Sequence, residues 1–396
     1  RQFLLFQALQ LDLVATAFLR QLRDPVIQRP MRRTQGVQPG IDLGLGRTLV
    51  HHIVPLSNDH CPYSTGWPVG ATSPGVGGRR AQEAAGMTRL IADIGGTNAR
   101  FALLGPDGQA SDERHFLVRD HADPGAAIEA YLGGRPITEA VLAVATPVES
   151  DEVRFTNSPW RFSINALRER LHIPQLAVIN DFVAQALAMP HLAAEELEPI
   201  GGGAPKAGRA IGVLGAGTGL GVSVLVPVRD GWTALPTEGG HVSFAPGNER
   251  EDRLLALLRG RYGHVSNERL LSGQGLLNLA RSLAEVDGRA ITATTAEAVT
   301  EAARLGSCLA SVEATQMFSA LLGSAAGDLA LTAGARGGVY LAGGVCLRLG
   351  DLFDRAAFRR RFADKGRMRA YLEPIPAWLV RRGDTGLLGA ARYRLD

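Results

Sequence analysis

Residues 90–104 read Leu-Ile-Ala-Asp-Ile-Gly-Gly-Thr-Asn-Ala-Arg-Phe-Ala-Leu-Leu. Two apolar, strand-like runs flank the turn Gly95-Gly96-Thr97-Asn98, a pattern that predicts a β-hairpin. Asp93 lies near the end of the first expected strand, just before the glycines. Backbone N–H groups in such a turn can form an anion-binding hollow, and a nearby aspartate can hold Mg²⁺ through its water ligands. A plain Gly-Gly hairpin with an incidental aspartate is the alternative interpretation.

A second stretch repeats this pattern. Residues 211–226 read Ile-Gly-Val-Leu-Gly-Ala-Gly-Thr-Gly-Leu-Gly-Val-Ser-Val-Leu-Val. The run lacks the lysine of the G-x-x-x-x-G-K-[ST] phosphate loop, and it fails the dinucleotide fingerprint because Leu220 or Val222 occupies the third glycine position. Four alternating glycines around Thr218 can still surround a phosphate. Two hairpins of this kind, far apart in the chain, predict two similar lobes that each present one hairpin to a triphosphate.

A third glycine run, residues 337–345, reads Gly-Gly-Val-Tyr-Leu-Ala-Gly-Gly-Val. It predicts a strand that ends in Gly-Gly. Because glycine lets a ligand approach the backbone closely, this turn would suit a flat purine. A simple strand-to-helix turn is the alternative.

A polar pair ends a short apolar strand at Ala177-Val178-Ile179-Asn180-Asp181-Phe182. A helical run from Val183 to Met189 follows and is stopped by Pro190. A carboxylate between a strand end and a helix start is a frequent site position in open α/β sheets. Asn180 and Asp181 are also good helix N-caps, and capping is compatible with a catalytic role.

Further polar side chains come from Glu238-Gly239-Gly240-His241 and from Glu268. The two glycines let Glu238 and His241 converge on a small ligand, and several acceptors and donors of this kind suit the hydroxyls of a sugar. Glu268 alone is typical of a solvated acid at a helix start. His241 as a zinc ligand is disfavoured because no second histidine stands at helical spacing near it.

The composition is that of an ordinary globular protein, with 45% hydrophobic and 20% charged residues in 396. Formal net charge is +3, and the excess lies in residues 1–86, which carry nine arginines and five acidic residues. A near-neutral body lacks the strongly basic face that nucleic-acid binding requires. The three cysteines lie far apart without a C-x-x-C motif, so a disulfide framework is not expected and a reducing compartment is the default.

Residues 1–86 differ in sequence pattern from the remainder of the chain. They contain one possible amphipathic helix, about Phe3 to Leu22, and then scattered Pro and Gly typical of a linker. We interpret them as a non-catalytic extension, either a disordered leader or sequence upstream of a true start at Met87. A DNA-binding module is the alternative, but a helix-turn-helix needs two packed helices. No apolar run is long enough to span a bilayer, so no membrane partner is expected and a cytoplasmic location is predicted.

The residues from Met87 to Asp396 resemble bacterial glucokinase, the glucose-specific hexokinase group. The resemblance rests on the order and spacing of six motifs: Ala92-Asp93-Ile94-Gly95-Gly96-Thr97-Asn98-Ala99-Arg100, Ile179-Asn180-Asp181-Phe182, Gly215-Ala216-Gly217-Thr218-Gly219-Leu220-Gly221, Glu238-Gly239-Gly240-His241-Val242, Gly263-His264-Val265-Ser266-Asn267-Glu268-Arg269 and Leu271-Ser272-Gly273. Ala92 departs from the family pattern, which usually has Gly before the Asp. No Cys-rich zinc motif follows Glu238, which excludes the repressor/kinase branch of this fold.

The resemblance implies an α/β fold of the two-lobed actin-like ATPase (ribonuclease H-like) type. Each lobe would be a mixed β-sheet flanked by helices, with the active site in the interlobe cleft. We predict a small lobe of residues 87–190 plus 384–396, and a large lobe of residues 191–383. The resemblance also implies a homodimer.

The implied reaction is transfer of the γ-phosphoryl of ATP to the 6-hydroxyl of glucose, with Mg²⁺ as cofactor. Asp181 would be the general base. The glucose hydroxyls would be bound by Asn180, Asp181, Glu238, His241 and Glu268. The ATP phosphates would be bound by Ala92, Asp93, Ile94, Gly95, Gly96 and Thr97 of the first turn and by Gly215, Gly217, Thr218 and Gly219 of the second, with Asp93 holding Mg²⁺ through water.

Three other functions remain open on the sequence alone. The first is a kinase of another hexose on the same scaffold, such as mannose, fructose or an N-acetylated sugar. The second is a kinase-like transcriptional regulator that uses the N-terminal extension, against which an intact Asp181 argues. The third is an ATPase of the same fold that acts without sugar.

Overall fold

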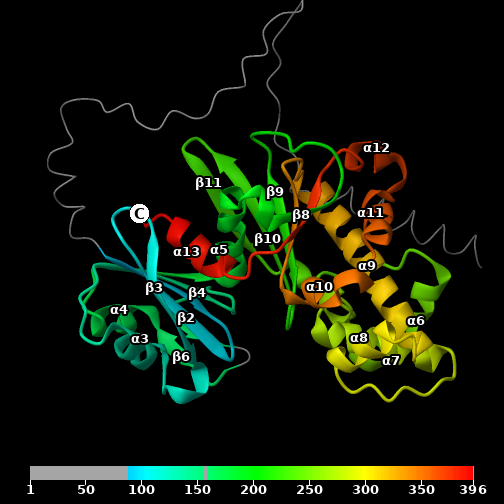
Figure 1. The fold of residues 1–396 in the computed structure, drawn as a ribbon, viewed down its shortest axis with the longest axis horizontal. Coiled ribbons are helices and arrows are strands. Elements are labelled where there is room, and N and C mark those ends of the chain that lie inside the picture. The colour runs from blue at the N-terminus through cyan, green and yellow to red at the C-terminus, as the bar shows by residue number, and fades with distance from the viewer. Residues whose placement is uncertain (1–87, 156–157, 396) are drawn as a thin grey trace, which may run out of the picture. The chain divides into compact units, whose positions relative to one another are not determined.

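The computed structural model describes residues 88–155 and 158–395 (Figure 1). The proposed extension over residues 1–86, with its helix from Phe3 to Leu22, lies outside the described residues. So does Met87, the proposed start of the folded body.

Two mixed sheets form the framework, and the first has the strand order β3-β2-β1-β4-β7. Its strands are β1 (Arg89–Ile94), β2 (Asn98–Leu104), β3 (Ala110–Leu117), β4 (Glu139–Val144) and β7 (Gln175–Asn180). β1, β2 and β3 are antiparallel neighbours, whereas β4 and β7 run parallel to β1. β4 is buried along its whole length, as expected of a central parallel strand covered on both faces.

The second sheet, of order β11-β10-β9-β12-β13-β8, repeats this arrangement. Its strands are β8 (Leu197–Gly201), β9 (Ile211–Ala216), β10 (Leu220–Val228), β11 (Gly231–Thr237), β12 (Gly338–Ala342) and β13 (Ala377–Val380). β9 is antiparallel to β10 and parallel to β12, as β1 is antiparallel to β2 and parallel to β4. β8 adds one antiparallel edge strand. Both expected glycine hairpins form, and they join equivalent strands of the two sheets.

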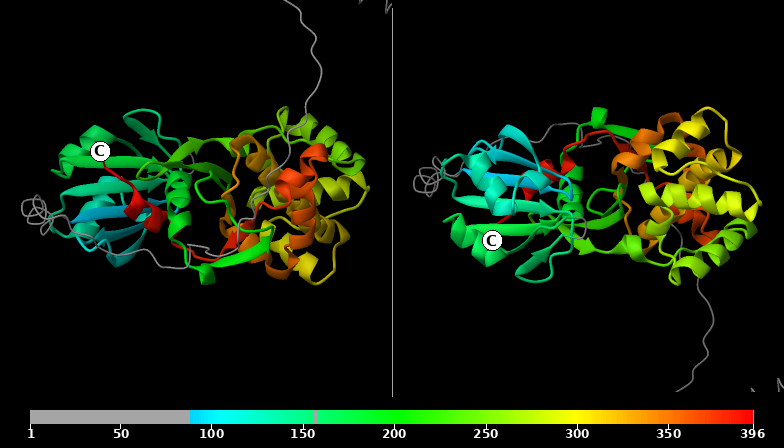
Figure 2. Two further views of the ribbon diagram at one scale, coloured as in Figure 1. Left: turned by 90° about the horizontal axis from the view of Figure 1, so that it is seen from above. Right: turned by 90° about the horizontal axis from the view of Figure 1, so that it is seen from below.

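Helices cover the sheets (Figures 1 and 2). They are α3 (Pro124–Leu132), α4 (Ile164–Arg170), α5 (Asp181–Ala188), α6 (Glu249–Tyr262), α7 (Gly273–Val286), α8 (Ala296–Arg304), α9 (Leu309–Ala333), α10 (Gly344–Leu349), α11 (Arg355–Ala363), α12 (Arg369–Leu372) and α13 (Thr385–Arg392). A two-stranded sheet joins β5 (Glu152–Arg154) to β6 (Arg161–Ser163). In the described part of the chain, no helix combines the length and apolarity needed to cross a membrane.

Three apolar clusters hold these layers together. One packs α3 and α4 on the first sheet and includes Phe101, Ile128, Tyr131 and Trp160. A second lies where the two sheets meet α5 and α13, and it includes Ile91, Ile179, Val213 and Leu387. The third fills the space between the second sheet and its helices with residues such as Leu214, Leu283, Phe318 and Phe358.

The C-terminal helix α13 packs against α5 and against the first sheet, although it follows the last parallel strand of the second sheet. Two glycines make the approach possible. A Cβ at Gly389 would overlap the Ala184 carbonyl oxygen of α5, and a Cβ at Gly386 would overlap the Asp93 carboxylate. The boundaries of the two lobes, at 190/191 and 383/384, stay a prediction.

Phe182 of α5 reaches across to the second sheet. Gly215 of β9 and Gly221 of β10 are direct cross-strand partners. A Cβ at either position would overlap the Phe182 ring. The paired glycines therefore leave room on the face of the sheet, and the Phe182 ring fills it.

Gly221→Ala should destabilise the protein because the new Cβ overlaps the Phe182 ring. Overpacking of this kind typically costs about 1–3 kcal/mol, and urea unfolding measures it. Gly260→Ala is the matched control: Gly260 lies in α6, and its Cβ would meet nothing within 4 Å. That change should be neutral or stabilising. Adding Phe182→Leu to Gly221→Ala should recover part of the loss; equal stability of Gly221→Ala and wild type would refute the overlap.

Candidate active site

Asp181 is the first residue of α5 and directly follows β7. The helix therefore begins two residues earlier than the expected Val183. Asn180 caps it: the side-chain Oδ1 accepts the Phe182 N–H at 2.8 Å, and Nδ2 donates to the Thr146 carbonyl oxygen at 3.3 Å. The capping interpretation of Asn180 is correct, and both of its amide atoms take part in local hydrogen bonds that fix where Asp181 stands.

The environment of Asp181 favours its protonated form. Burial, followed by the negative charges of Asp93 and Glu238, raises the pKa of this carboxyl to about 7, against the lowering effect of hydrogen bonds from the backbone N–H groups of Phe182 and of Asp181 itself. A carboxyl with a pKa near neutrality can accept a proton at physiological pH and later release it. Because Asp93 and Glu238 act on Asp181 through their charges, the three acids lie in one neighbourhood.

Asp93 is the penultimate residue of β1, close to the first turn. Its side chain is 25% exposed, and its Oδ2 lies 3.7 Å from Nη1 of Arg100. Burial raises the pKa of Asp93, and the Arg100 charge opposes this rise. The neighbouring Ala92 and Ile94 have fully buried side chains, so only their backbone can face a ligand.

The first turn itself, Gly95 to Thr97, joins β1 to β2. The Gly95 N–H already donates to the Asn98 carbonyl oxygen at 2.9 Å. Thr97 is exposed and Gly96 is partly exposed. Gly95, which is also partly exposed, Gly96 and Thr97 are therefore accessible to a ligand, as is part of the Asp93 side chain.

The second turn, residues 217–219, is closed by a hydrogen bond from the Gly217 N–H to the Gly219 carbonyl oxygen at 2.8 Å. Thr218 is exposed at its tip. A Cβ at Gly217 would meet no atom within 4 Å, whereas Gly215 faces the Phe182 ring. Of the predicted phosphate-binding glycines in this turn, Gly217 has open space and Gly215 has a packing role.

Glu238, His241 and Glu268 come together from two short helical turns, Gly239–His241 and Asn267–Arg269. Nε2 of His241 lies 3.8 Å from Oε2 of Glu238, and its Nδ1 lies 3.9 Å from Oε1 of Glu268. All three side chains keep substantial exposure, so their donors and acceptors are available to a ligand. The structure thus brings these three predicted sugar-binding residues together, and the charge of Glu238 reaches Asp181.

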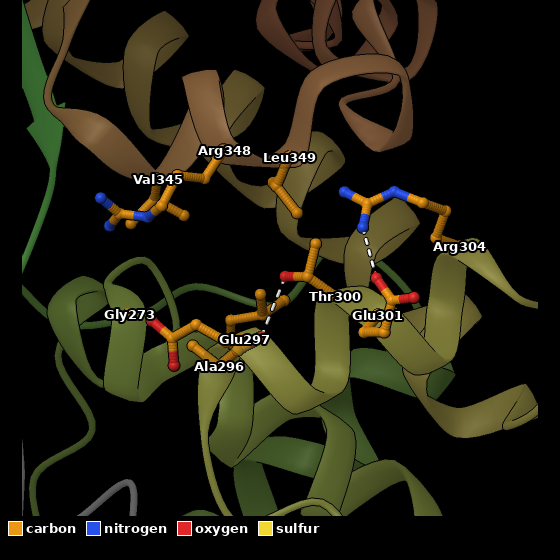
Figure 3. Close-up of a pocket in the computed structure, with 10 residues that line it drawn as sticks. Gly273, Ala296, Glu297, Thr300, Glu301, Arg304, Val345, Arg348 and Leu349 are labelled. Carbon is orange, nitrogen blue, oxygen red and sulfur yellow. Dashed lines mark hydrogen bonds and ion pairs between the residues drawn. The ribbon is translucent and has the colours of Figure 1, made fainter.

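A cavity of about 360 Å³ opens beside the second turn. Its lining side chains come from α7, α8 and α10: Gly273, Leu276, Ala296, Glu297, Thr300, Glu301, Arg304, Val345, Arg348 and Leu349. Figure 3 shows the α10 residues facing those of α8 across the space, with Glu301 paired to Arg304. Gly273, on its rim, donates its N–H to the Gly217 carbonyl oxygen at 2.8 Å. The cavity is therefore contiguous with the glycine turn.

The sequence interpretation missed most of these cavity residues. It singled out the glycine run before α10, where Gly343 has a φ of +83°, but it gave no role to α8. The residues of α8 have no motif of their own, since an amphipathic helix with Glu297 and Thr300 is typical of any surface helix. Only the fold brings α8 opposite α10.

Asp93 and Asp181 are the residues of this site that could hold a metal ion. Within residues 88–155 and 158–395, no group of three or more His, Cys, Asp or Glu side chains is arranged as a metal site. Mg²⁺ does not need such a cage, because it is usually held by one or two carboxylates together with substrate phosphates and water. Two carboxyls close enough to interact through their charges, next to the glycine turns, fit this mode of binding.

Comparison with known proteins agrees with this geometry. The family model described as Glucokinase matches residues 90–396. The glucokinase of Paramagnetospirillum magneticum is 47% identical over 312 residues, which cover 78% of this chain and 97% of that protein. The glucokinase of Chromohalobacter salexigens is 49% identical over 310 residues, 77% of this chain and 97% of that protein. The crystal structure of glucokinase from an Antarctic psychrotroph superimposes with a TM-score of 0.71 at 35% identity, over 77% of this chain and 98% of that one. The chain belongs to the Glucokinase family, and its architecture is the two-lobed ATPase-like fold of these sugar kinases.

Proposed function

We propose that this chain transfers the γ-phosphoryl of ATP to the 6-hydroxyl of D-glucose, giving glucose 6-phosphate and ADP. The observation that carries the proposal is the group of Glu238, His241 and Glu268 beside a glycine turn, with Asp181 within range of the Glu238 charge, in a chain of the Glucokinase family. Glucokinase is therefore its enzyme class, and carbohydrate metabolism its setting.

Asp181 acts as the general base in this proposal. An alcohol is a weak nucleophile, so a carboxylate within hydrogen-bond reach must orient the hydroxyl and accept its proton. Such help typically contributes about 10²–10⁴-fold to the rate. Asn180 positions Asp181 through the helix cap. Glu238, His241 and Glu268 bind the other hydroxyls and so hold the sugar in place for reaction.

The two turns handle the phosphates. Gly96, Thr97, Gly217 and Thr218 offer accessible backbone and hydroxyl groups, and Asp93 holds Mg²⁺ through water. Bound Mg²⁺ neutralises charge on the phosphate oxygens. The cavity between α8 and α10 has the position and size for the nucleoside of ATP, which supports the interpretation of the nearby glycine run as a purine site.

Two alternatives are not favoured. A kinase of another hexose would need a different set of relatives from the glucokinases found. A transcriptional regulator would have no need of a base such as Asp181 with its raised pKa. We further propose a cytoplasmic enzyme, because ATP is its phosphoryl donor, and the homodimer remains a prediction.

A coupled spectrophotometric assay over a panel of hexoses tests the function. Glucose should be phosphorylated well ahead of mannose, fructose and N-acetylated sugars. Asp181→Asn should lower kcat by about 10²–10⁴-fold, because the proton acceptor is lost. Glucose binding, measured by calorimetry, should persist in that variant. Near-normal turnover by Asp181→Asn would remove this residue from the role of base.

The pH dependence of kcat/KM for glucose should report the Asp181 carboxyl of the free enzyme. The pKa of about 7 means that the base is protonated, and inactive, at lower pH. The rate constant should therefore rise about tenfold per pH unit below pH 7 and level off above it. In the Asp93→Asn variant, the rise of the residual kcat/KM with pH should occur at lower pH than in wild type. The reason is that the Asp93 charge, which raises the pKa of Asp181, is removed. A flat profile between pH 5 and pH 8 would contradict the assignment.

Gly217→Ala tests whether a phosphate binds at Gly217, because the substitution should change ATP binding without changing the packing of the protein. A Cβ at Gly217 would meet no atom of the protein within 4 Å, so the melting temperature should stay the same or rise slightly. The same methyl group would occupy the space offered to a phosphate, and the KM for ATP should rise about tenfold or more. Unchanged ATP kinetics in a stable Gly217→Ala protein would place the phosphates elsewhere.

A further inference from the structure

Glu268 touches the second glycine turn directly. Its Oε2 accepts the backbone N–H of Leu220, the residue after the turn, at 2.9 Å. A Cβ at Gly219 would overlap the same oxygen, so the turn and the carboxylate are in close contact. A side chain at position 219 would therefore displace the Glu268 carboxylate from its present place, and no unusual backbone angle calls for glycine there.

The other carboxylate oxygen of Glu268 points to the sugar pocket. Oε1 lies 3.9 Å from Nδ1 of His241, whose Nε2 faces Glu238. The Glu268 side chain is 31% exposed and open to a ligand on this side. One carboxylate thus borders both the proposed sugar pocket and the proposed phosphate turn.

Backbone contacts brace this arrangement from both ends. Ser272 Oγ donates to the Glu268 carbonyl oxygen at 3.0 Å, and the Gly273 N–H donates to the Gly217 carbonyl oxygen at 2.8 Å. The segment from Glu268 to Gly273 is therefore joined to both ends of the turn. These contacts hold the backbone of Glu268 close to the turn, so its carboxylate starts within reach of the Leu220 N–H.

The negative charge of Glu268 determines how this contact affects the binding of a phosphate at the turn. A carboxylate that holds an N–H of the turn repels an incoming phosphate and competes with it for the same donor. When sugar hydroxyls donate to Oε1, part of the negative charge is compensated by hydrogen bonds. The cost of placing a phosphate at the turn should then fall.

We propose that Glu268 couples the two substrate sites, so that occupation of the sugar pocket raises the affinity of the glycine turn for nucleotide. The inference rests on the proposed function. By linkage, nucleotide raises the affinity for glucose by the same factor. Glu268 acts on the nucleotide as a positioning residue through the Leu220 N–H.

Glu238 provides the matched control. It also carries a carboxylate next to His241, at 3.8 Å. No contact between Glu238 and the turn residues 217–220 occurs among the hydrogen bonds and ion pairs of the described residues. Glu238→Gln should weaken glucose binding and leave the coupling intact.

Calorimetry with a non-hydrolysable ATP analogue and Mg²⁺ tests the proposal on the full chain, without glucose and with glucose at a concentration shown to saturate each variant. Wild type should bind the analogue about 5–150-fold more tightly with glucose. Glu268→Gln, which keeps an acceptor for the Leu220 N–H but loses the charge, should bind the analogue more tightly than wild type without glucose. In this variant, glucose should increase the affinity for the analogue by about twofold or less. Its KM for glucose should also rise.

Gly219→Ala perturbs the same contact from the other side, because its Cβ would displace the Glu268 carboxylate. This variant should also lose the glucose-dependent gain. The coupling role would be overturned if glucose tightened analogue binding by Glu268→Gln as much as by wild type, or if Glu268→Gln without glucose bound the analogue no more tightly than wild type. It would also be overturned if glucose did not tighten analogue binding by wild type. These outcomes leave the proposed function standing if wild type still phosphorylates glucose, and absence of that activity would refute the function itself.

Discussion

The site depends on the contact between the Phe182 ring and the glycine pair of the second sheet. Gly215 and Gly221 face each other across β9 and β10, and the ring of Phe182 occupies the space their missing side chains leave. Asp181 precedes Phe182 in the chain, and the turn 217–219 lies between the two glycines. One packing contact therefore sets the distance between the carboxyl and the turn. Interiors packed at this density tolerate little change in side-chain volume, so the spacing is well defined.

The repeated strand order places two aspartates in comparable positions, but their surroundings shift the pKa values of the two carboxyls in opposite directions. Asp181 begins α5 after the last parallel strand of the first sheet, and Asp384 directly precedes α13 after the last parallel strand of the second. Arg382 donates to both oxygens of Asp384, at 2.6 and 2.9 Å, and lowers the pKa of that carboxyl. Asp181 instead has acidic neighbours and a raised pKa. The same architecture thus yields one structural carboxylate and one suited to proton transfer.

The two hairpins and the strand before Asp181 were predicted from sequence because each depends on local pattern, and Glu238, His241 and Glu268, which were predicted to bind sugar, lie together in the structure. Other features depend on long-range contacts that local pattern does not encode. The Leu220 N–H lies 48 residues from Glu268, its hydrogen-bond partner, and no motif joins them. Glycines at 215, 219 and 221 were explained from sequence by access for phosphate. The structure assigns all three to close contacts with Phe182 or Glu268.

The balance of charge explains why the substrates should help one another. Asp93, Asp181, Glu238 and Glu268 place four carboxyl groups around a site proposed to receive a polyphosphate, with Arg100 and His241 as neighbouring cationic or polar partners. Such a site repels ATP unless its charges are compensated. In the proposed function, Mg²⁺ would compensate the carboxyls near the first turn, and sugar hydroxyls would do so at the second. An acidic pocket that accepts a neutral sugar more readily than a bare triphosphate favours entry of sugar before transfer, which limits the exposure of bound ATP to water.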